Sequence, residues 1–153
     1  MSESCCVISP SEQIAACPAN GQVGRKVDLQ TVKAMLRLPL DVLQSKEYRF
    51  CTDPACQVVY YSVEGQQVFT EEHLRERVFQ KHPEEPQSLV CYCFQHTVGE
   101  VWARGQAVVD AISRGVKAGQ CACEIRNPQG SCCLGNVRTL LRANIAWYSN
   151  FAF

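Results

Sequence analysis

Cysteine is the residue type that most plainly points to chemistry in this 153-residue chain, which contains eleven of them. An odd number of cysteines cannot be paired completely in disulfides within one chain, and thiolates are good ligands for zinc, copper and iron–sulfur clusters. Several of the cysteines are adjacent or separated by one residue, which is awkward for a disulfide but suits ligands that converge on one centre. The spacing therefore predicts metal ligation in a reducing compartment.

Six of the cysteines follow residue 90 in three close pairs, each beside a signal for a turn or a helix end. A 2Fe-2S cluster needs four thiolates, two on each iron, and free N–H groups at the start of a helix stabilise its negative charge. The pairs therefore predict a 2Fe-2S site, and a zinc site made of the same thiols is the alternative. Spacing alone leaves open which four of the six thiols bind. The pairs are Cys91 with Cys93, Cys121 with Cys123, and Cys132 with Cys133.

A second group of cysteines lies in the first half of the chain. Cys17 precedes a Pro-Ala-Asn-Gly turn, and Cys51 and Cys56 enclose a turn that contains a proline. Zinc ribbons present thiolates from two such turns, so this pattern predicts a zinc site. Its fourth position is open to Cys5, Cys6, a histidine or water. The competing interpretation is three unligated cysteines in a small α/β fold.

The periodicity of apolar residues predicts an α+β fold, with a small α/β zinc-ribbon-like subdomain followed by a helical 2Fe-2S subdomain. Short β-rich runs end at residues 27, 51, 62 and 69, and we expect Thr31 and Thr70 to cap helices. In the second half, Thr97 and Glu100 form a capping-box pattern, and a last helix begins near Leu134. The expected division is a mobile tail over 1–16, a zinc-binding subdomain over 17–81, a proline-containing linker over 82–88 and a cluster-binding subdomain over 89–153.

Composition excludes several classes of protein. Fifteen basic residues balance fifteen acidic ones, so no basic field indicates a nucleic-acid partner or a membrane surface. No apolar run approaches the roughly 20 residues that span a bilayer, and the N-terminus lacks the features of a secretory signal. We therefore expect a cytoplasmic protein without direct membrane insertion. The oligomeric state is not predicted.

Three segments of the second half together resemble the N-terminal domain of the CopZ-type copper chaperones, which binds a 2Fe-2S cluster and a zinc ion. The cluster half is also similar to bacterioferritin-associated ferredoxin. The resemblance implies that Cys91, Cys93, Cys123 and Cys133 bind the cluster, and that Cys121 and Cys132 are spare. It also implies a zinc site at Cys17, Cys51 and Cys56. The segments are Val90–Thr97, Lys117–Glu124 and Asn127–Val137.

The chain departs from this family at two points. Asn20 stands where the first zinc knuckle of the family often has its second cysteine, and the chain contains no Cys-x-x-Cys, the pattern of the family's copper loop. We therefore expect one-electron transfer linked to copper or other metal handling, such as the reduction of Cu(II) to Cu(I) for a copper-carrying or redox partner. The alternative is a non-redox adaptor or sensor that docks on a metal transporter or reductase. No motif indicates an enzyme with its own substrate.

Overall fold

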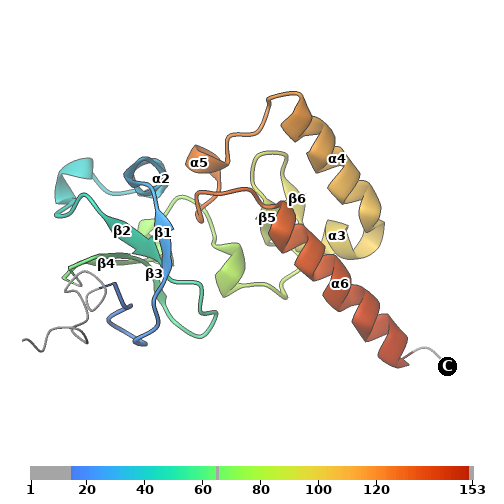
Figure 1. Cartoon of the computed structure of the whole chain (residues 1–153), viewed down its shortest axis with the longest axis horizontal. Coiled ribbons are helices and arrows are strands. Elements are labelled where there is room, and N and C mark those ends of the chain that lie inside the picture. Colours follow the sequence, from blue (N-terminus) through green and yellow to red (C-terminus); the bar gives the residue numbers. More distant parts are fainter. Residues whose placement is uncertain (1–14, 65, 152–153) are drawn as a thin grey trace, which may run out of the picture.

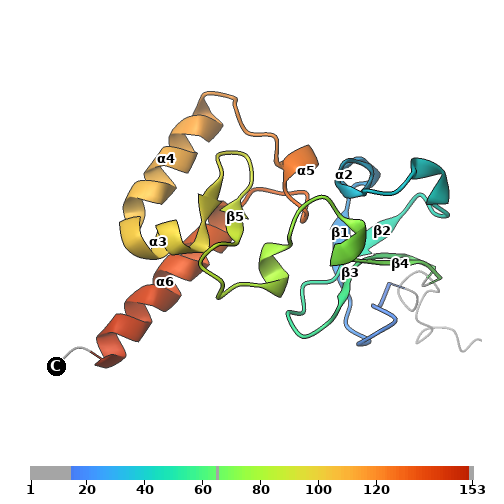
Figure 2. The same ribbon diagram turned by 180° about the vertical axis from the view of Figure 1, so that it is seen from behind.

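The computed structural model describes residues 15–64 and 66–151, with side chains described up to residue 143. Its first part, residues 15–88, is called the N-terminal half below, and residues 89–151 are the C-terminal half. Figures 1 and 2 show a small sheet in the N-terminal half and a group of helices in the C-terminal half. The mixed α/β architecture predicted from the sequence is thus confirmed.

The N-terminal half is built on an antiparallel sheet with the strand order β1-β2-β3-β4. Its β-branched and aromatic runs form these strands because such side chains pack well on a pleated surface. Tyr48, Phe50 and Tyr60 are almost fully buried between the sheet and the neighbouring helix α2. The elements are β1 (Arg25–Val27), α2 (Leu29–Met35), η2 (Leu40–Val42), β2 (Tyr48–Phe50), β3 (Val58–Ser62) and β4 (Val68–Thr70).

Two predicted helix starts in this half have different outcomes. Thr31 lies inside α2, whose N-cap is Asp28, so that start is wrong. Thr70 is an N-cap as predicted, but the element that it caps is only the short 3-10 turn η3 (Glu71–His73). The chain after η3 stays extended because Leu74 pairs with Leu36 as an isolated β-bridge, so its backbone groups already have partners. Its apolar side chains reach the core from this extended segment without forming a helix.

Helices dominate the C-terminal half, as the sequence predicted. Thr97 caps α3 in a capping box with Glu100, and Gly105 separates α3 from α4 with a positive φ of 57° that favours glycine. The apolar faces of α3, α4 and α6 meet in one core beside a two-stranded sheet. The elements are β5 (Leu89–Cys91), β6 (His96–Thr97), α3 (Val98–Arg104), α4 (Gln106–Lys117), α5 (Cys123–Arg126) and α6 (Leu134–Phe151).

The two halves are in contact through α5, which lies against α2 in both ribbon views. The Thr31 hydroxyl donates to the Glu124 carbonyl at 2.6 Å, and the Tyr60 hydroxyl donates to the Pro128 carbonyl. These bonds join the sheet side of the molecule to the loop that follows α5. The division into separately folding subdomains stays a prediction. These contacts mean that the two halves are hydrogen-bonded to each other.

The predicted linker over 82–88 packs against the start of α3. The backbone N–H of Val98 donates to the Ser88 carbonyl at 2.8 Å, and that of Gly99 donates to the Pro86 carbonyl at 3.0 Å. A short 3-10 turn, η4 (Phe79–Lys81), precedes this segment. Within the described part of the chain, no helix has the length and apolar character needed to cross a membrane.

Candidate metal centres

Three thiols of the N-terminal half converge in what we call the cysteine trio: Cys17, Cys51 and Cys56. Their Sγ atoms all lie within 4.8 Å of one another, and those of Cys17 and Cys56 are 3.9 Å apart. Zn–S bonds of about 2.3 Å in a tetrahedron place two sulfurs roughly 3.8 Å apart, so this spacing suits one zinc ion. All three side chains are buried, with at most 9% of Cys56 exposed. The structure thus places side by side the three residues that the sequence predicted as zinc ligands.

Tight turns beside the sheet hold the cysteine trio in place. The Gly21 N–H donates to the Cys17 carbonyl at 2.8 Å, and the Cys56 N–H donates to the Asp53 carbonyl at 3.1 Å. The first turn uses a positive φ of 75° at Gly21. Burial raises the pKa of the Cys56 thiol, because a thiolate loses its solvation there. A bound cation reverses this preference by stabilising the thiolate.

Asn20 lies beside the trio at the place of the missing fourth cysteine. Its Nδ2 atom donates to the sulfur of Cys51 at 3.5 Å and to Oδ2 of Asp53 at 3.0 Å. Its Oδ1 atom is engaged by the N–H of Gln22 at 2.9 Å. The amide nitrogen therefore faces the thiol, and it stabilises a thiolate as a hydrogen-bond donor. Cys5 and Cys6, two other candidates for the fourth ligand, lie outside the described residues.

A second set of sulfurs, the four-thiol group, consists of Cys91, Cys93, Cys123 and Cys133. The Sγ atoms of Cys93 and Cys123 are 3.6 Å apart. The thiol of Cys133 is hydrogen-bonded to the sulfurs of both Cys91 and Cys123. The four residues implied by the sequence resemblance thus lie together. Cys121 and Cys132, the two remaining cysteines of this half, are exposed.

Three separate segments deliver the four-thiol group. Cys91 ends β5, Cys93 lies in the following turn, Cys123 begins α5 and Cys133 immediately precedes α6. The N–H of Ala122 donates to the sulfur of Cys93 at 3.1 Å. Backbone donors of this kind favour thiolates and tune any metal that the thiolates bind.

Hydrogen bonds among these thiols separate their acidities. A bond from Cys133 lowers the pKa of Cys91 to about 7 and that of Cys123 to about 6. The pKa of Cys133 is raised because it donates to both, and burial raises the pKa of Cys93 to about 11. Metal binding to these thiols requires their deprotonation, so it would be coupled to proton release.

A buried polar network shapes the loop that carries Cys133. The Gln129 side chain donates to the carbonyls of Ser131 at 3.1 Å and Cys132 at 3.0 Å, and it accepts from Gln80 and from Asn136. Gln80 belongs to η4 of the N-terminal half. The position of Cys133 therefore depends on side chains from both halves.

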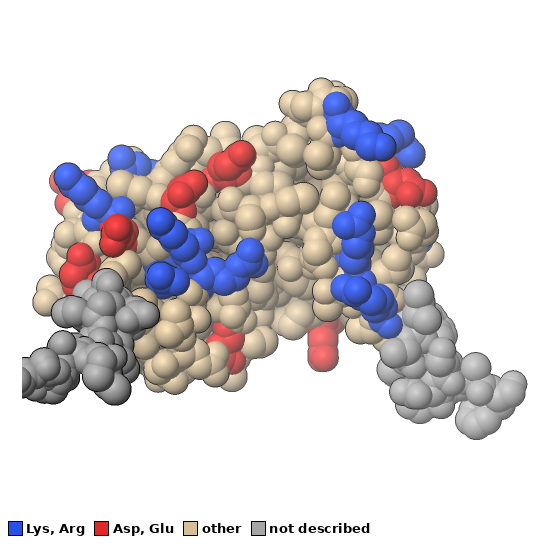
Figure 3. All heavy atoms as spheres, viewed as in Figure 1, with Lys and Arg blue, Asp and Glu red and all other residues tan. Residues whose placement is uncertain are grey.

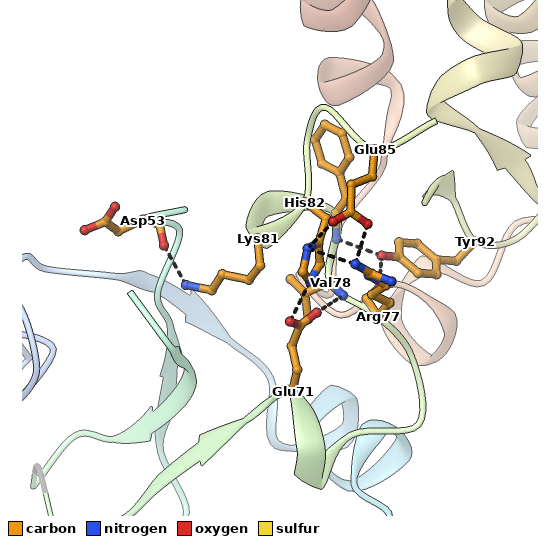
Figure 4. Close-up of polar contacts among 9 residues, drawn as sticks. Asp53, Glu71, Arg77, Val78, Lys81, His82, Glu85 and Tyr92 are labelled. Carbon is orange, nitrogen blue, oxygen red and sulfur yellow. Dashed lines mark hydrogen bonds and ion pairs between the residues drawn. The ribbon is translucent and has the colours of Figure 1, made fainter. Parts of the chain in front are cut away.

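Sequence reasoning missed a polar network around His82, the first residue of the predicted linker. Figure 4 shows its ring between two carboxylates: Nε2 lies 2.7 Å from Glu71, and Nδ1 lies 3.2 Å from Glu85. Arg77 also pairs with Glu85. Glu85 is only three residues from His82, whereas Glu71 is eleven residues away, so the contact with Glu71 depends on the tertiary fold.

The same segment contacts both cysteine sites. Lys81 donates from Nζ to the Asp53 carbonyl at 2.7 Å, inside the turn between Cys51 and Cys56. Tyr92 lies between Cys91 and Cys93 in the sequence. Its hydroxyl accepts from the Phe79 N–H at 2.9 Å and donates to the Arg77 carbonyl. Residues 77–82 thus connect the two sites.

Comparison with known proteins agrees with this geometry. Residues 14–75 match a family described as a zinc binding domain. This matched range includes all three residues of the cysteine trio. The chain is 32% identical over 124 residues to the copper chaperone CopZ of Archaeoglobus fulgidus, an alignment that covers 76% of this chain and 57% of that protein. The chain therefore spans little more than half the length of this relative.

A solved structure matches most of the chain. The X-ray structure of the Archaeoglobus fulgidus CopZ N-terminal domain superposes with a TM-score of 0.66 at 29% sequence identity. The match covers 82% of this chain and 96% of that domain, so it includes both halves of the fold. Residues 14–75 therefore match a zinc binding domain family, and the chain is similar in sequence and fold to the N-terminal domain of Archaeoglobus fulgidus CopZ.

Proposed function

We propose that this chain binds a 2Fe-2S cluster in addition to zinc and serves one-electron transfer linked to copper or other metal handling. The convergence of the four-thiol group carries this proposal. Four buried or half-buried sulfurs meet from three segments, and two further cysteines of the same half remain exposed beside them. Such a selection is expected of a ligand set and is not needed for packing alone.

The contacts within the four-thiol group suit a centre with two irons. In the cysteine trio all sulfurs are mutually close, as one ion requires. In the four-thiol group, by contrast, the contacts run from Cys91 to Cys133, on to Cys123 and then to Cys93. A 2Fe-2S cluster bound there supplies one-electron redox chemistry. The protein residues hold the thiolates, donate hydrogen bonds to their sulfurs and exclude water.

Shielding residues around the four-thiol group support this proposal. Phe94 packs over Gly115 of α4 so closely that a Cβ at that position would clash with the ring. Tyr92 is buried on the other side of the turn. A site shielded by apolar rings keeps water away from metal and sulfur, which controls the reduction potential.

Copper enters the proposal through the relative, which is named a copper chaperone. We infer by analogy with this relative that the electron serves a protein that carries copper. Pairs of soft ligands suit the transfer of Cu(I) between such proteins. The zinc site then contributes stability to the fold.

The test is anaerobic purification with iron, zinc and sulfide assays and a visible spectrum. We expect a red-brown protein with about two irons per chain and about one zinc. Reduction by one electron, followed by electron paramagnetic resonance, measures whether the centre is redox-active. Colourless protein with zinc on the four-thiol group would contradict the proposal, and an irreducible cluster would favour the adaptor role.

A further inference from the structure

Charge is distributed unevenly along the chain although the total is zero. Residues 1–88 contain nine basic and twelve acidic side chains, a net charge of −3 with neutral histidines. Residues 89–153 contain six basic and three acidic side chains, a net charge of +3. After Glu124 the sequence has no further acidic residue. The half that holds the four-thiol group is therefore the basic half.

Two groups of basic side chains lie on the face viewed in Figure 1. Figure 3 shows Lys and Arg side chains over β1 and over α6, with mostly uncharged surface between the groups and acidic side chains beside the group over β1. Arg25 is the exposed arginine of β1, and Arg138 and Arg142 are the exposed arginines of α6. We call the surface around these three arginines the basic face.

The basic face borders the chain segment that ends in the four-thiol group. The Arg25 guanidinium donates to the hydroxyl of Ser131 at 3.4 Å, and Ser131 is followed by the exposed Cys132 and the buried Cys133. Arg138 follows within the first turns of the helix that begins after Cys133. Arg25 therefore contacts the segment that carries Cys133, and Arg138 lies five residues after this cysteine in the sequence.

We propose that the basic face is the docking surface for an acidic protein that exchanges electrons with this chain. This inference rests on the proposed function, because it identifies the kind of protein that would exchange electrons with the proposed cluster. Four thiolates around iron form an anionic centre that would repel an acidic partner, and nearby arginines offset that repulsion. Complementary charge steers weak, short-lived electron-transfer encounters, whose interfaces are small.

The basic face is better suited to an acidic protein than to a nucleic acid. Nucleic-acid binding is dominated by many contacts to phosphate groups. Three arginines offer few such contacts, and residues 1–88, which lie beside them, carry a net charge of −3. Each arginine has a planar guanidinium group that can bind one carboxylate through two hydrogen bonds. A protein with clustered Asp and Glu is therefore the partner that the face fits.

The experiment measures binding of the full chain to an acidic flavodoxin, with basic cytochrome c as the opposite probe. Surface plasmon resonance is recorded as salt rises from about 0.02 M to about 0.2 M, which shortens the screening length severalfold. We expect flavodoxin binding that weakens at least about tenfold over this range and little binding of cytochrome c.

Two double variants with the same charge change locate the surface. Arg138→Glu with Arg142→Glu reverses the basic face, and Lys33→Glu with Arg37→Glu reverses two exposed side chains at α2. We expect the first pair to weaken flavodoxin binding at least about tenfold and the second less than about threefold. Equal effects of the two pairs, salt-independent binding, or a preference for cytochrome c or duplex DNA would each overturn the proposal.

The binding measurement does not require a cluster, so it tests the docking surface separately from the proposed electron-transfer function. Circular dichroism checks that both variants keep the fold, and visible absorbance reports any cluster. Absence of visible absorbance in the wild-type protein would defeat the proposed function, whereas the binding comparison alone decides the docking surface. Where the cluster is present, the rate of electron transfer from reduced flavodoxin should fall in parallel with binding.

Discussion

The thiols of the cysteine trio come from two turns beside one sheet, whereas those of the four-thiol group come from three segments of the C-terminal half. The first site is held mainly by local turn hydrogen bonds at Cys17 and Cys56. The second depends on a loop that Gln129 shapes with help from Gln80 of the other half. This contrast teaches that two turns beside one sheet can bring three thiols together, whereas the four-thiol group depends on side chains from both halves.

The largest expected effect separates ligand thiols from spare thiols in the C-terminal half. Cys93→Ser should abolish the iron content and the visible spectrum, because it removes one of four thiolates and its contact with Cys123. Cys132→Ser is the matched control, since this thiol is exposed and should leave the iron content unchanged. Iron analysis with visible spectroscopy measures both. An unchanged spectrum in Cys93→Ser would show that the ligand assignment is wrong.

The next effect concerns the fourth position of the cysteine trio. Asn20→Cys should raise the zinc affinity at least about tenfold, because it completes a set of four thiolates. Asn20→Ala should lower the affinity by about tenfold, because it removes the N–H donor to the sulfur of Cys51. Competition with a calibrated zinc chelator measures both. Equal affinities in the two variants would indicate that Asn20 does not border the metal position.

Two adjacent tyrosines test how strongly the sites depend on each other. Tyr60→Phe removes the donor to the Pro128 carbonyl near Cys133 and should cost about 1–3 kcal/mol of unfolding free energy and some iron retention. Tyr61→Phe removes a donor to the Ala15 carbonyl, within the N-terminal half. It should cost similar stability without loss of iron. Urea unfolding and timed iron release distinguish the two, and equal iron loss in both would contradict the cross-half link.

The smallest expected effect is on the pH dependence of stability, and it concerns a carboxylate in α3, away from both sites. The pKa of Glu100 is lowered, first by its hydrogen bond with His96 and then by the backbone at Thr97. Its charged form is therefore favoured in the folded state, and this stabilisation is present above the unfolded pKa of about 4.3 and is lost as pH falls through the lower folded value. The partly exposed pair should contribute no more than about 0.5 kcal/mol.

Glu100→Gln keeps a side-chain acceptor for the Thr97 N–H but does not titrate. Urea unfolding between about pH 7 and about pH 3 should therefore show a shallower loss of stability in this variant than in the wild type. Glu84→Gln, an exposed position in the connection between the halves, is the control and should follow the wild type. Indistinguishable curves for all three proteins would show that the Glu100 pair adds nothing to stability.

The sequence by itself determined the local features of this protein. Runs of β-branched and aromatic residues predicted the strands, and Thr97 with Glu100 predicted the start of α3, because these signals act between near neighbours. The cysteines of the trio were also predicted, because turn residues surround them. The helix start at Thr31 was predicted wrongly, because Asp28 is the N-cap of α2. Thr70 is a cap as predicted, but the pairing of Leu74 with Leu36 leaves only the short turn η3 after it.

Only the tertiary structure decided the selection of thiols and the contacts between the halves. Nothing in the spacing distinguishes Cys123 from Cys121, and the resemblance was needed to choose between them. In the fold, Cys123 turns inward at the start of α5 while Cys121 stays exposed. The choice depends on packing of segments far apart in the chain, since sulfur positions follow from the whole core and cannot be encoded in local spacing.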